Sequence, residues 1–152
     1  MEAINNDQRL ILVRKLKRIF NNDLRGKRVT LWGLSFKPQT DDMRMAPSIY
    51  VAEALIEAGA EVFAYDPIAI AEAKKHISHK VSYFDDAYTA LKNSDALMLL
   101  TEWPEFRIPD WGEVKMLMRS PVILDGRNIY SGDRLRGLGF HYEGIVSRVN
   151  QD

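Results

Sequence analysis

Hydrophobic and polar residues form blocks of two lengths along most of the chain. From Gly26 onward, short apolar runs of strand length are separated by longer segments of helix length. The predicted strands are 28–33, 61–65, 80–84, 96–101, 122–124 and 140–146, and the predicted helices between them are 46–58, 68–77, 85–93, 110–119 and 131–137. Strands alternating with helices are typical of a mostly parallel sheet that helices cover on both faces. The sequence therefore predicts an α/β, doubly wound, Rossmann-like fold of about six strands.

The predicted helix at 46–58 shows the asymmetry that real helix ends have. Pro47 stands in its first turn, where the missing N–H of proline does no harm, and Gly59 follows its last residue. We therefore expect this helix to connect the first two strands.

A further helix is predicted before the first strand. Residues 2–20 place Leu12, Leu16, Ile19 and Phe20 on one helical face and basic side chains elsewhere. The apolar face must pack against something, and the sequence leaves open whether this is the rest of the chain or a second copy. The basic side chains indicate either a solvated face, which we favour, or a surface for an acidic partner.

Charge separates this first segment from the remainder. From Arg9 to Arg28 there are eight basic residues and one acidic residue, whereas the rest of the chain is net negative. We divide the chain into a helix with its linker, residues 1–25, and a domain, residues 26–152.

Composition excludes several classes of function. The 152 residues contain 21 basic and 21 acidic side chains, and this balance argues against nucleic acid or a membrane surface as the main partner. The longest apolar run, Ala96 to Leu100, is much too short to span a membrane, and the first seven residues do not look like a signal peptide. We expect a soluble, cytoplasmic protein.

The absence of cysteine removes a second group of functions. Without a thiol there is no disulfide, no thiolate metal ligand and no cysteine nucleophile. His76 and His79 stand three positions apart in a lysine-rich stretch, which indicates a solvated helix rather than a metal site. We expect neither a metal site nor a catalytic residue in this chain.

Candidate binding residues follow from the predicted sheet. Ligands of doubly wound sheets bind beyond the carboxyl ends of the strands, near the point where strand order reverses. The loop after the first strand leads to a helix N-terminus and carries Lys37 and Arg44, a combination that suits an anion. It contains one glycine and matches neither G-x-G-x-x-G nor a P-loop. We therefore do not expect it to hold a dinucleotide pyrophosphate in the usual Rossmann manner.

For the carboxylates near these strand ends, the sequence allows either a role in binding or catalysis or a structural role. Asp66 follows the second strand, where an acid can bind a ribose, but without the glycine motif we favour a role in the turn. Asp41 and Asp42 could form an acid/base or magnesium pair. We favour roles as caps of the following helix and as partners of Arg44.

For two later loops, the sequence does not decide between a ligand-binding role and a structural role. The aromatic rings within 101–107 suit either stacking on a base or partner, or packing over the sheet. Gly126 allows a tight turn that presents Arg127, whose guanidinium suits either a phosphate or carboxylate ligand, or a surface ion pair.

Taken together, the motifs of these loops point to a known family. They are GLSFKPQTDDMR at 33–44 followed by APS at 46–48, YDP at 65–67, TEWPEF at 101–106 and DGRN at 125–128. In order, spacing and position at strand ends they resemble the C-terminal, UDP-binding domain of UDP-glucose 6-dehydrogenases, within the UDP-glucose/GDP-mannose dehydrogenase family. The first helix, with Asn5-Asn6-Asp7-Gln8, resembles the end of the long central helix that precedes this domain in the family.

The resemblance implies a role in a four-electron oxidation. Such enzymes pass two hydrides to NAD and convert UDP-glucose to UDP-glucuronate, a nucleotide sugar for polysaccharide biosynthesis, through intermediates bound to a cysteine. That cysteine and the G-x-G-x-x-G turn lie elsewhere in the family's polypeptides, so the chain resembles roughly the last third of such an enzyme. By itself it is expected to be inactive, with NAD bound mainly by the missing part. The resemblance further implies that the intact enzyme is a homodimer or larger.

The family pattern also assigns ligands to individual residues. It places Phe36, Lys37 and Arg127 on the UDP-sugar and Arg44 on the NAD. Glu102 matches its motif, as does Trp103, but neither receives a role. Two alternatives remain: the same domain of a GDP-mannose or UDP-N-acetylmannosamine dehydrogenase, and a non-catalytic α/β interaction module. In two further positions, Ser35 and Met45 replace an alanine and a polar residue that are frequent in the family.

Overall fold

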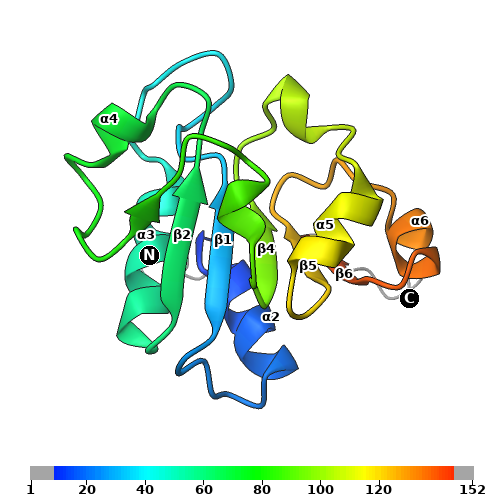
Figure 1. The fold of residues 1–152 in the computed structure, drawn as a ribbon. Coiled ribbons are helices and arrows are strands. Elements are labelled where there is room, and N and C mark those ends of the chain that lie inside the picture. Colours follow the sequence, from blue (N-terminus) through cyan, green and yellow to red (C-terminus); the bar gives the residue numbers. More distant parts are fainter. Residues whose placement is uncertain (1–8, 146–152) are drawn as a thin grey trace.

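The structure, a computed structural model that describes residues 9–145, is built on one six-stranded sheet (Figure 1). Its elements are α2 (Ile11–Ile19), β1 (Arg28–Trp32), α3 (Pro47–Glu57), β2 (Glu61–Tyr65), α4 (Ile70–Ala73), β3 (Ser82–Tyr83), η1 (Thr89–Leu91), β4 (Ala96–Leu99), η2 (Pro104–Phe106), α5 (Trp111–Leu117), β5 (Val122–Asp125), α6 (Gly132–Gly137) and β6 (His141–Gly144). The strand order is β3-β2-β1-β4-β5-β6, and every neighbouring pair is parallel. The predicted α/β, doubly wound fold is confirmed, and the strand order reverses between β1 and β4.

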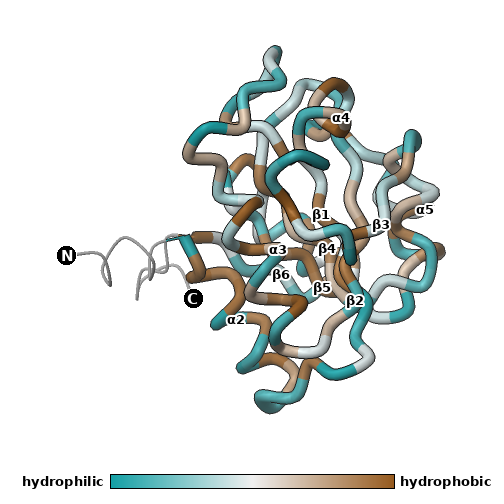
Figure 2. The backbone as a smooth tube through the Cα atoms, turned by 90° about the vertical axis from the view of Figure 1, so that its left-hand side faces the viewer, coloured by the Kyte–Doolittle hydropathy of each residue, from teal (hydrophilic) through white to brown (hydrophobic). Residues whose placement is uncertain are grey.

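Side-chain alternation along the strands creates a core on each face of the sheet. In β4, Ala96 and Met98 join the core that α2 and α3 cover, whereas Leu97 and Leu99 join the core that η1 and α5 cover. All four side chains are fully buried. Hydrophobic colour therefore gathers in the middle of the molecule, along α3 and the strands, and hydrophilic colour in the outer loops (Figure 2).

The N-terminal helix packs against its own domain, which answers one question that the sequence left open. Leu12, Val13 and Leu16 of α2 are buried in the same core as α3 and the sheet, and Ile19 packs partly buried against it. Glu143 of β6 ties the outer side of the helix with ion pairs to Arg18 at 2.7 Å and to Lys15 at 3.6 Å. The Asn5-Asn6-Asp7-Gln8 segment lies outside the described residues.

Two predicted helices differ from what the structure contains. The helix predicted at 85–93 is wrong, because only the short 3-10 helix η1 forms there. The hydrogen bond from the backbone N–H of Thr89 to the Asp86 carboxylate is of the kind that starts a helical turn, but the backbone leaves the helical conformation at Lys92, with ψ of 123°, and at Asn93, with a left-handed φ of 62°, so the segment stays short. The helix predicted at 68–77 is reduced to the four residues of α4.

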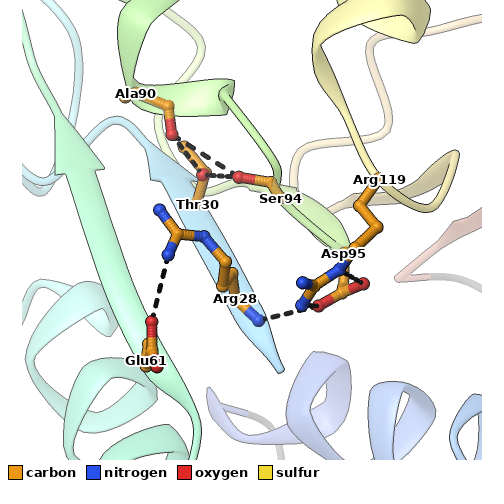
Figure 3. Close-up of polar contacts among 7 residues, drawn as sticks. All are labelled: Arg28, Thr30, Glu61, Ala90, Ser94, Asp95 and Arg119. Carbon is orange, nitrogen blue, oxygen red and sulfur yellow. Dashed lines mark hydrogen bonds and ion pairs between the residues drawn. The ribbon is translucent and has the colours of Figure 1, made fainter. Parts of the chain in front are cut away.

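The amino ends of the strands, which we call the amino edge, are closed by a buried carboxylate (Figure 3). Asp95 precedes β4, is 2% exposed and binds both nitrogens of one side of the Arg119 guanidinium, at 3.0 and 2.6 Å. It also accepts hydrogen bonds from the backbone N–H of Arg28 at 3.0 Å and the hydroxyl of Ser120 at 3.0 Å. The Asp95 carboxylate is therefore satisfied by hydrogen bonds within its own domain.

A second polar group lies just inside this edge. The hydroxyl of Thr30 donates to the carbonyl of Ala90 and is in contact with the hydroxyl of Ser94, which joins β1 to the end of η1 (Figure 3). All three are buried.

Within residues 9–145, no helix has both the length and the apolar character needed to cross a membrane.

Candidate functional site

The opposite ends of the strands form the carboxyl edge, where β1 and β4 approach each other closely. Gly33 directly follows β1 with φ of +94°, and a Cβ atom at this position would lie 2.5 Å from the Cβ of Thr101. Only glycine therefore lets the two strand ends meet. The hydroxyl of Thr101 donates to the carbonyl of Ser35 at 2.7 Å and joins the two loops at the point where strand order reverses.

Asp66, at the end of β2, organises the first loop. Its side chain is 2% exposed, and its two oxygens accept five hydrogen bonds. The donors are the backbone N–H groups of Leu34, Ser35, Ile68 and Ala69 and the indole N–H of Trp103, at 2.7, 3.2, 2.9, 2.8 and 3.2 Å. The turn role predicted for Asp66 is confirmed, and its carboxylate is fully used inside the fold.

The loop between β1 and α3 keeps its shape through short-range hydrogen bonds. The Ser35 hydroxyl donates to the carbonyl of Lys37 at 2.8 Å, and the N–H of Phe36 donates to the carbonyl of Asp42 at 2.8 Å. Ser35 is buried, whereas the side chains of Phe36 and Lys37 are exposed, Phe36 by 46%. The loop is thus rigidly supported from below and presents an aromatic ring and an ammonium group to solvent.

Lys37, Asp42 and Arg44 form a small charged group, which we call the Asp42 cluster. The Asp42 carboxylate accepts from the Arg44 guanidinium at 3.0 and 3.0 Å and from its backbone N–H at 2.9 Å. These hydrogen bonds, with a smaller contribution from the Lys37 charge, lower the pKa of Asp42 to about 2. The predicted Asp42–Arg44 partnership is confirmed.

The predicted capping role of these aspartates is wrong. The N-cap residue of α3 is Ala46, and no side chain caps the helix. Met45, at φ of 60°, turns the backbone between Asp42 and the helix, so the carboxylates stand too far from its first turn. Ser48 instead anchors the helix start, because its hydroxyl donates to the carbonyl of Leu34 at 2.7 Å.

A hollow of about 490 Å³ lies beside the Asp42 cluster. It is lined by Thr40, Asp41, Asp42, Met43, Arg44, Glu72 and His76. The Glu72 carboxylate pairs with the imidazole of His76 at 3.6 Å and with the ammonium of Lys75 at 3.3 Å. Residues 9–145 bring no three histidine or acidic side chains together as metal ligands.

The aromatic rings of the loop after β4 pack over the sheet. Trp103 and Phe106 are 4% and 0% exposed, and the Phe106 ring stacks on Trp32 with ring centres 4.8 Å apart. Of the two alternatives that the sequence left open for this loop, the structure therefore contains the packed one. These rings are not available to stack on a nucleotide base.

Arg127 is held at its backbone and at its guanidinium. Its N–H donates at 3.0 Å to Asp125, which is fully buried. Its Nε and Nη2 atoms donate to the two carboxylate oxygens of Glu102 at 3.0 and 3.3 Å. We call Glu102, Asp125 and Arg127 the Arg127 cluster. The ion pair that the sequence left as one alternative is present.

Two tyrosines complete the support of the Arg127 cluster. The second oxygen of Asp125 accepts from the backbone N–H of Tyr130 at 2.9 Å and from the hydroxyl of Tyr142 at 2.9 Å. Burial, together with the nearby Asp125 charge, raises the pKa of both tyrosines above its ordinary value. Sequence reasoning missed the Tyr142 contact because no local motif links residues on two neighbouring strands. The only signal was the polar Asp125 directly after an apolar run.

The carboxyl edge thus carries all four residues proposed from the sequence, in two groups. Lys37 and Arg44 belong to the Asp42 cluster, with the exposed Phe36 on the same loop. Arg127 belongs to the second cluster, on the loops that follow β4 and β5. The Ser35–Thr101 hydrogen bond connects the loops that carry the two groups.

Comparison with known proteins links this edge to a family of enzymes. The profile of the UDP-glucose/GDP-mannose dehydrogenase family, UDP binding domain, matches residues 30–132. A UDP-glucose 6-dehydrogenase of Pseudomonas aeruginosa is 42% identical over 150 residues, which cover 95% of this chain and 33% of that protein. The UDP-glucose 6-dehydrogenase TuaD of Bacillus subtilis is 40% identical over 141 residues, covering 93% of this chain and 30% of that protein.

A solved structure agrees with these sequence matches. A UDP-glucose dehydrogenase from Pyrobaculum islandicum superposes with a TM-score of 0.80 and 30% identity, over 96% of this chain and 31% of that one. The chain therefore spans about a third of the length of the relatives it matches.

Proposed function

Because the chain belongs to the UDP-glucose/GDP-mannose dehydrogenase family, we propose that its carboxyl edge binds the UDP part of a UDP-sugar, with UDP-glucose as the substrate. The observation that carries the proposal is the position of the matched segment. Residues 30–132 include Phe36, Lys37 and Arg127, and all three follow strands at the edge where doubly wound sheets bind ligands.

The chemistry of these side chains suits a nucleoside diphosphate sugar. The Lys37 ammonium is exposed and offers three hydrogen-bond donors and a positive charge to a phosphate or a sugar hydroxyl. The exposed Phe36 ring offers an apolar face for the base or a sugar. The Arg127 guanidinium adds further donors from the loop after β5.

We propose that this chain binds only part of the NAD molecule. The loop after β1 has one glycine and lacks the G-x-G-x-x-G turn that brings a helix N-terminus against a pyrophosphate. We propose that NAD, which accepts the hydride in such an enzyme, is held mainly by other parts of the polypeptide and touches this chain at Arg44. Arg44 suits that contact because its side chain is 88% exposed although Asp42 binds one side of the guanidinium.

The proposal places the oxidation itself outside these 152 residues. No cysteine is present, so the thiol that the resemblance implies for the oxidation of the sugar must come from elsewhere. The residues of this chain would hold the UDP portion and orient the sugar toward that thiol.

Calorimetry tests the proposed binding. The chain is titrated with UDP, UDP-glucose, GDP and NAD, and the Lys37→Ala variant is compared with Lys92→Ala, which removes an exposed lysine from the opposite edge of the sheet. We expect the uridine ligands to bind best and Lys37→Ala to bind about five- to thirtyfold more weakly, whereas Lys92→Ala binds as the wild type does. Preference for GDP would move the chain to the GDP-mannose branch, and no binding of UDP at millimolar concentration would contradict the proposal.

A further inference from the structure

Within the TEWPEF motif, the side chain of Glu102 directly contacts Arg127, a proposed ligand-binding residue. Its carboxylate binds Nε and Nη2 of Arg127, which leaves both N–H groups of Nη1 and one of Nη2 without use in this pair. The side chains of Arg127 and Glu102 are 41% and 21% exposed. The pair therefore lies at the surface, with the remaining donors of the guanidinium on its other side.

The backbone beneath Arg127 is already fixed without Glu102. Asp125 holds the N–H of Arg127, and Tyr142 holds Asp125. Gly126 lies so close to β4 that a Cβ atom there would be 2.7 Å from the carbonyl oxygen of Leu99. These contacts do not fix the direction of the long Arg127 side chain, which has many rotamers of similar energy.

We propose that Glu102 is a positioning residue for UDP-sugar binding: it holds the Arg127 guanidinium in one orientation before the ligand arrives. A side chain that is already ordered loses less conformational entropy when a ligand binds, and this raises affinity without any new contact. Because the two residues follow neighbouring strands, the pair also ties the loops after β4 and β5 together. The inference rests on the proposed function, since Arg127 must contact the ligand.

The same pair could serve only to stabilise the fold, and this alternative predicts a different result. Exposed ion pairs contribute little to stability. If Glu102 acts through Arg127 on binding, its removal weakens UDP binding and leaves the thermal midpoint almost unchanged. If it only joined the loops, binding would be unaffected or would fall together with stability.

A double-mutant cycle of UDP binding tests the proposal on the full chain. The variants are Glu102→Ala, Arg127→Ala and the double variant, and Glu53→Ala, which removes an exposed glutamate from α3, is the control. We expect Glu102→Ala to weaken UDP binding about three- to tenfold in the wild-type background and to have no effect in the Arg127→Ala background. Glu102→Gln, whose amide oxygen can still accept from Nε, should restore part of the affinity.

The NMR signal of the Arg127 Nε–H gives a readout that needs no ligand. We expect a separate, slowly exchanging signal in the wild type, which Glu102→Ala removes and Glu102→Gln partly retains. Wild-type or tighter UDP binding by Glu102→Ala, or an equal loss in both backgrounds, would overturn the positioning role and leave the proposed function in place. Absence of UDP binding by the wild type would instead overturn the proposed function and this inference with it.

Discussion

A buried aspartate lies at both the amino edge and the carboxyl edge of the sheet, but it binds different kinds of partner at the two edges. Each has a buried aspartate that is 2% exposed, Asp95 at the amino edge and Asp66 at the carboxyl edge. Asp95 binds the guanidinium of Arg119 and so neutralises a charge of its own edge. Asp66 binds backbone N–H groups and an indole, and it leaves every charged side chain of its edge to other partners or to solvent.

This difference separates the part of the molecule that is closed from the part that can bind. At the amino edge Thr30 and Asp95 find their hydrogen-bond partners within the chain (Figure 3), although the buried Nε of Arg28 has none among the described residues. At the carboxyl edge the fold uses backbone donors to shape the loops, and Phe36, Lys37 and Arg44 stay exposed above them. Because Asp66 binds backbone N–H groups and an uncharged indole, it supports the site without neutralising any of its charged side chains.

The largest effect is expected from Asp66→Ala. This change removes the acceptor of five hydrogen bonds in a buried position and leaves their donors without a partner. We expect the free energy of unfolding to fall by about 3–5 kcal/mol and UDP binding to be lost. Urea denaturation measures the first and calorimetry the second; a loss below about 1 kcal/mol would show that Asp66 does not organise the edge.

Asp95→Ala is expected to have a smaller effect and of a different kind. It leaves the N–H of Arg28 without its partner, but the Arg119 side chain is 53% exposed and water can solvate it. We expect a loss of about 2–3 kcal/mol in the free energy of unfolding, with UDP affinity within about twofold of wild type wherever the chain is folded. A loss of UDP affinity comparable to that of Lys37→Ala would contradict the separation of the two edges.

Asp95 should also contribute to the loss of stability in acid. Burial raises the pKa of Asp95, but hydrogen bonds from Arg119, Arg28 and Ser120 outweigh this, so its pKa is below the usual value in the folded state. The unfolded chain therefore takes up the proton first, and stability falls as the pH drops below about 4. Asp95→Asn should show a weaker fall in urea midpoints between about pH 5 and pH 2.5; parallel curves for the two proteins would contradict this.

At the carboxyl edge, salt should distinguish the two proposed cations. Glu102 compensates the charge of Arg127 at 3.0 Å, whereas Lys37 contributes only a minor charge effect to Asp42. Lys37→Ala should therefore reduce the salt dependence of UDP affinity, and Arg127→Ala should lower affinity while changing that dependence much less. Calorimetry at low and high ionic strength measures the UDP affinity of each variant and its salt dependence. An equal change in salt dependence in the two variants would contradict the different roles of Lys37 and Arg127.

The smallest effect is expected from Ser35→Ala. The change deletes one hydrogen bond, from the Ser35 hydroxyl to the backbone carbonyl of the exposed residue Lys37. We expect about 0.5–1.5 kcal/mol less stability and a modest loss of UDP affinity, because the Phe36–Lys37 loop becomes less rigid. Ser48→Ala, which loses the bond to Leu34 below the same loop, is the comparison: an equal loss of UDP affinity in both would mean that neither acts on Lys37 in particular.

The sequence alone determined the class of fold and the place of the candidate site. Short continuous apolar runs predict strands such as 96–101, and Pro47 with Gly59 delimits α3, because these signals depend on neighbouring residues only. The candidate residues could be placed at one edge since parallel strands all end there. The helix expected at 85–93 failed because the backbone leaves the helical conformation at Lys92 and Asn93, directly after η1.

Only the tertiary structure decided which partner each polar group has. Arg127 could equally have pointed to solvent, and its pairing with Glu102 exists because β4 and β5 are neighbours in the sheet. Likewise Asp125 meets Tyr142 because β5 pairs with β6. A hydrogen bond acts over about 3 Å, whereas these partners stand 25 and 17 positions apart in sequence, and only the strand order brings them within that distance.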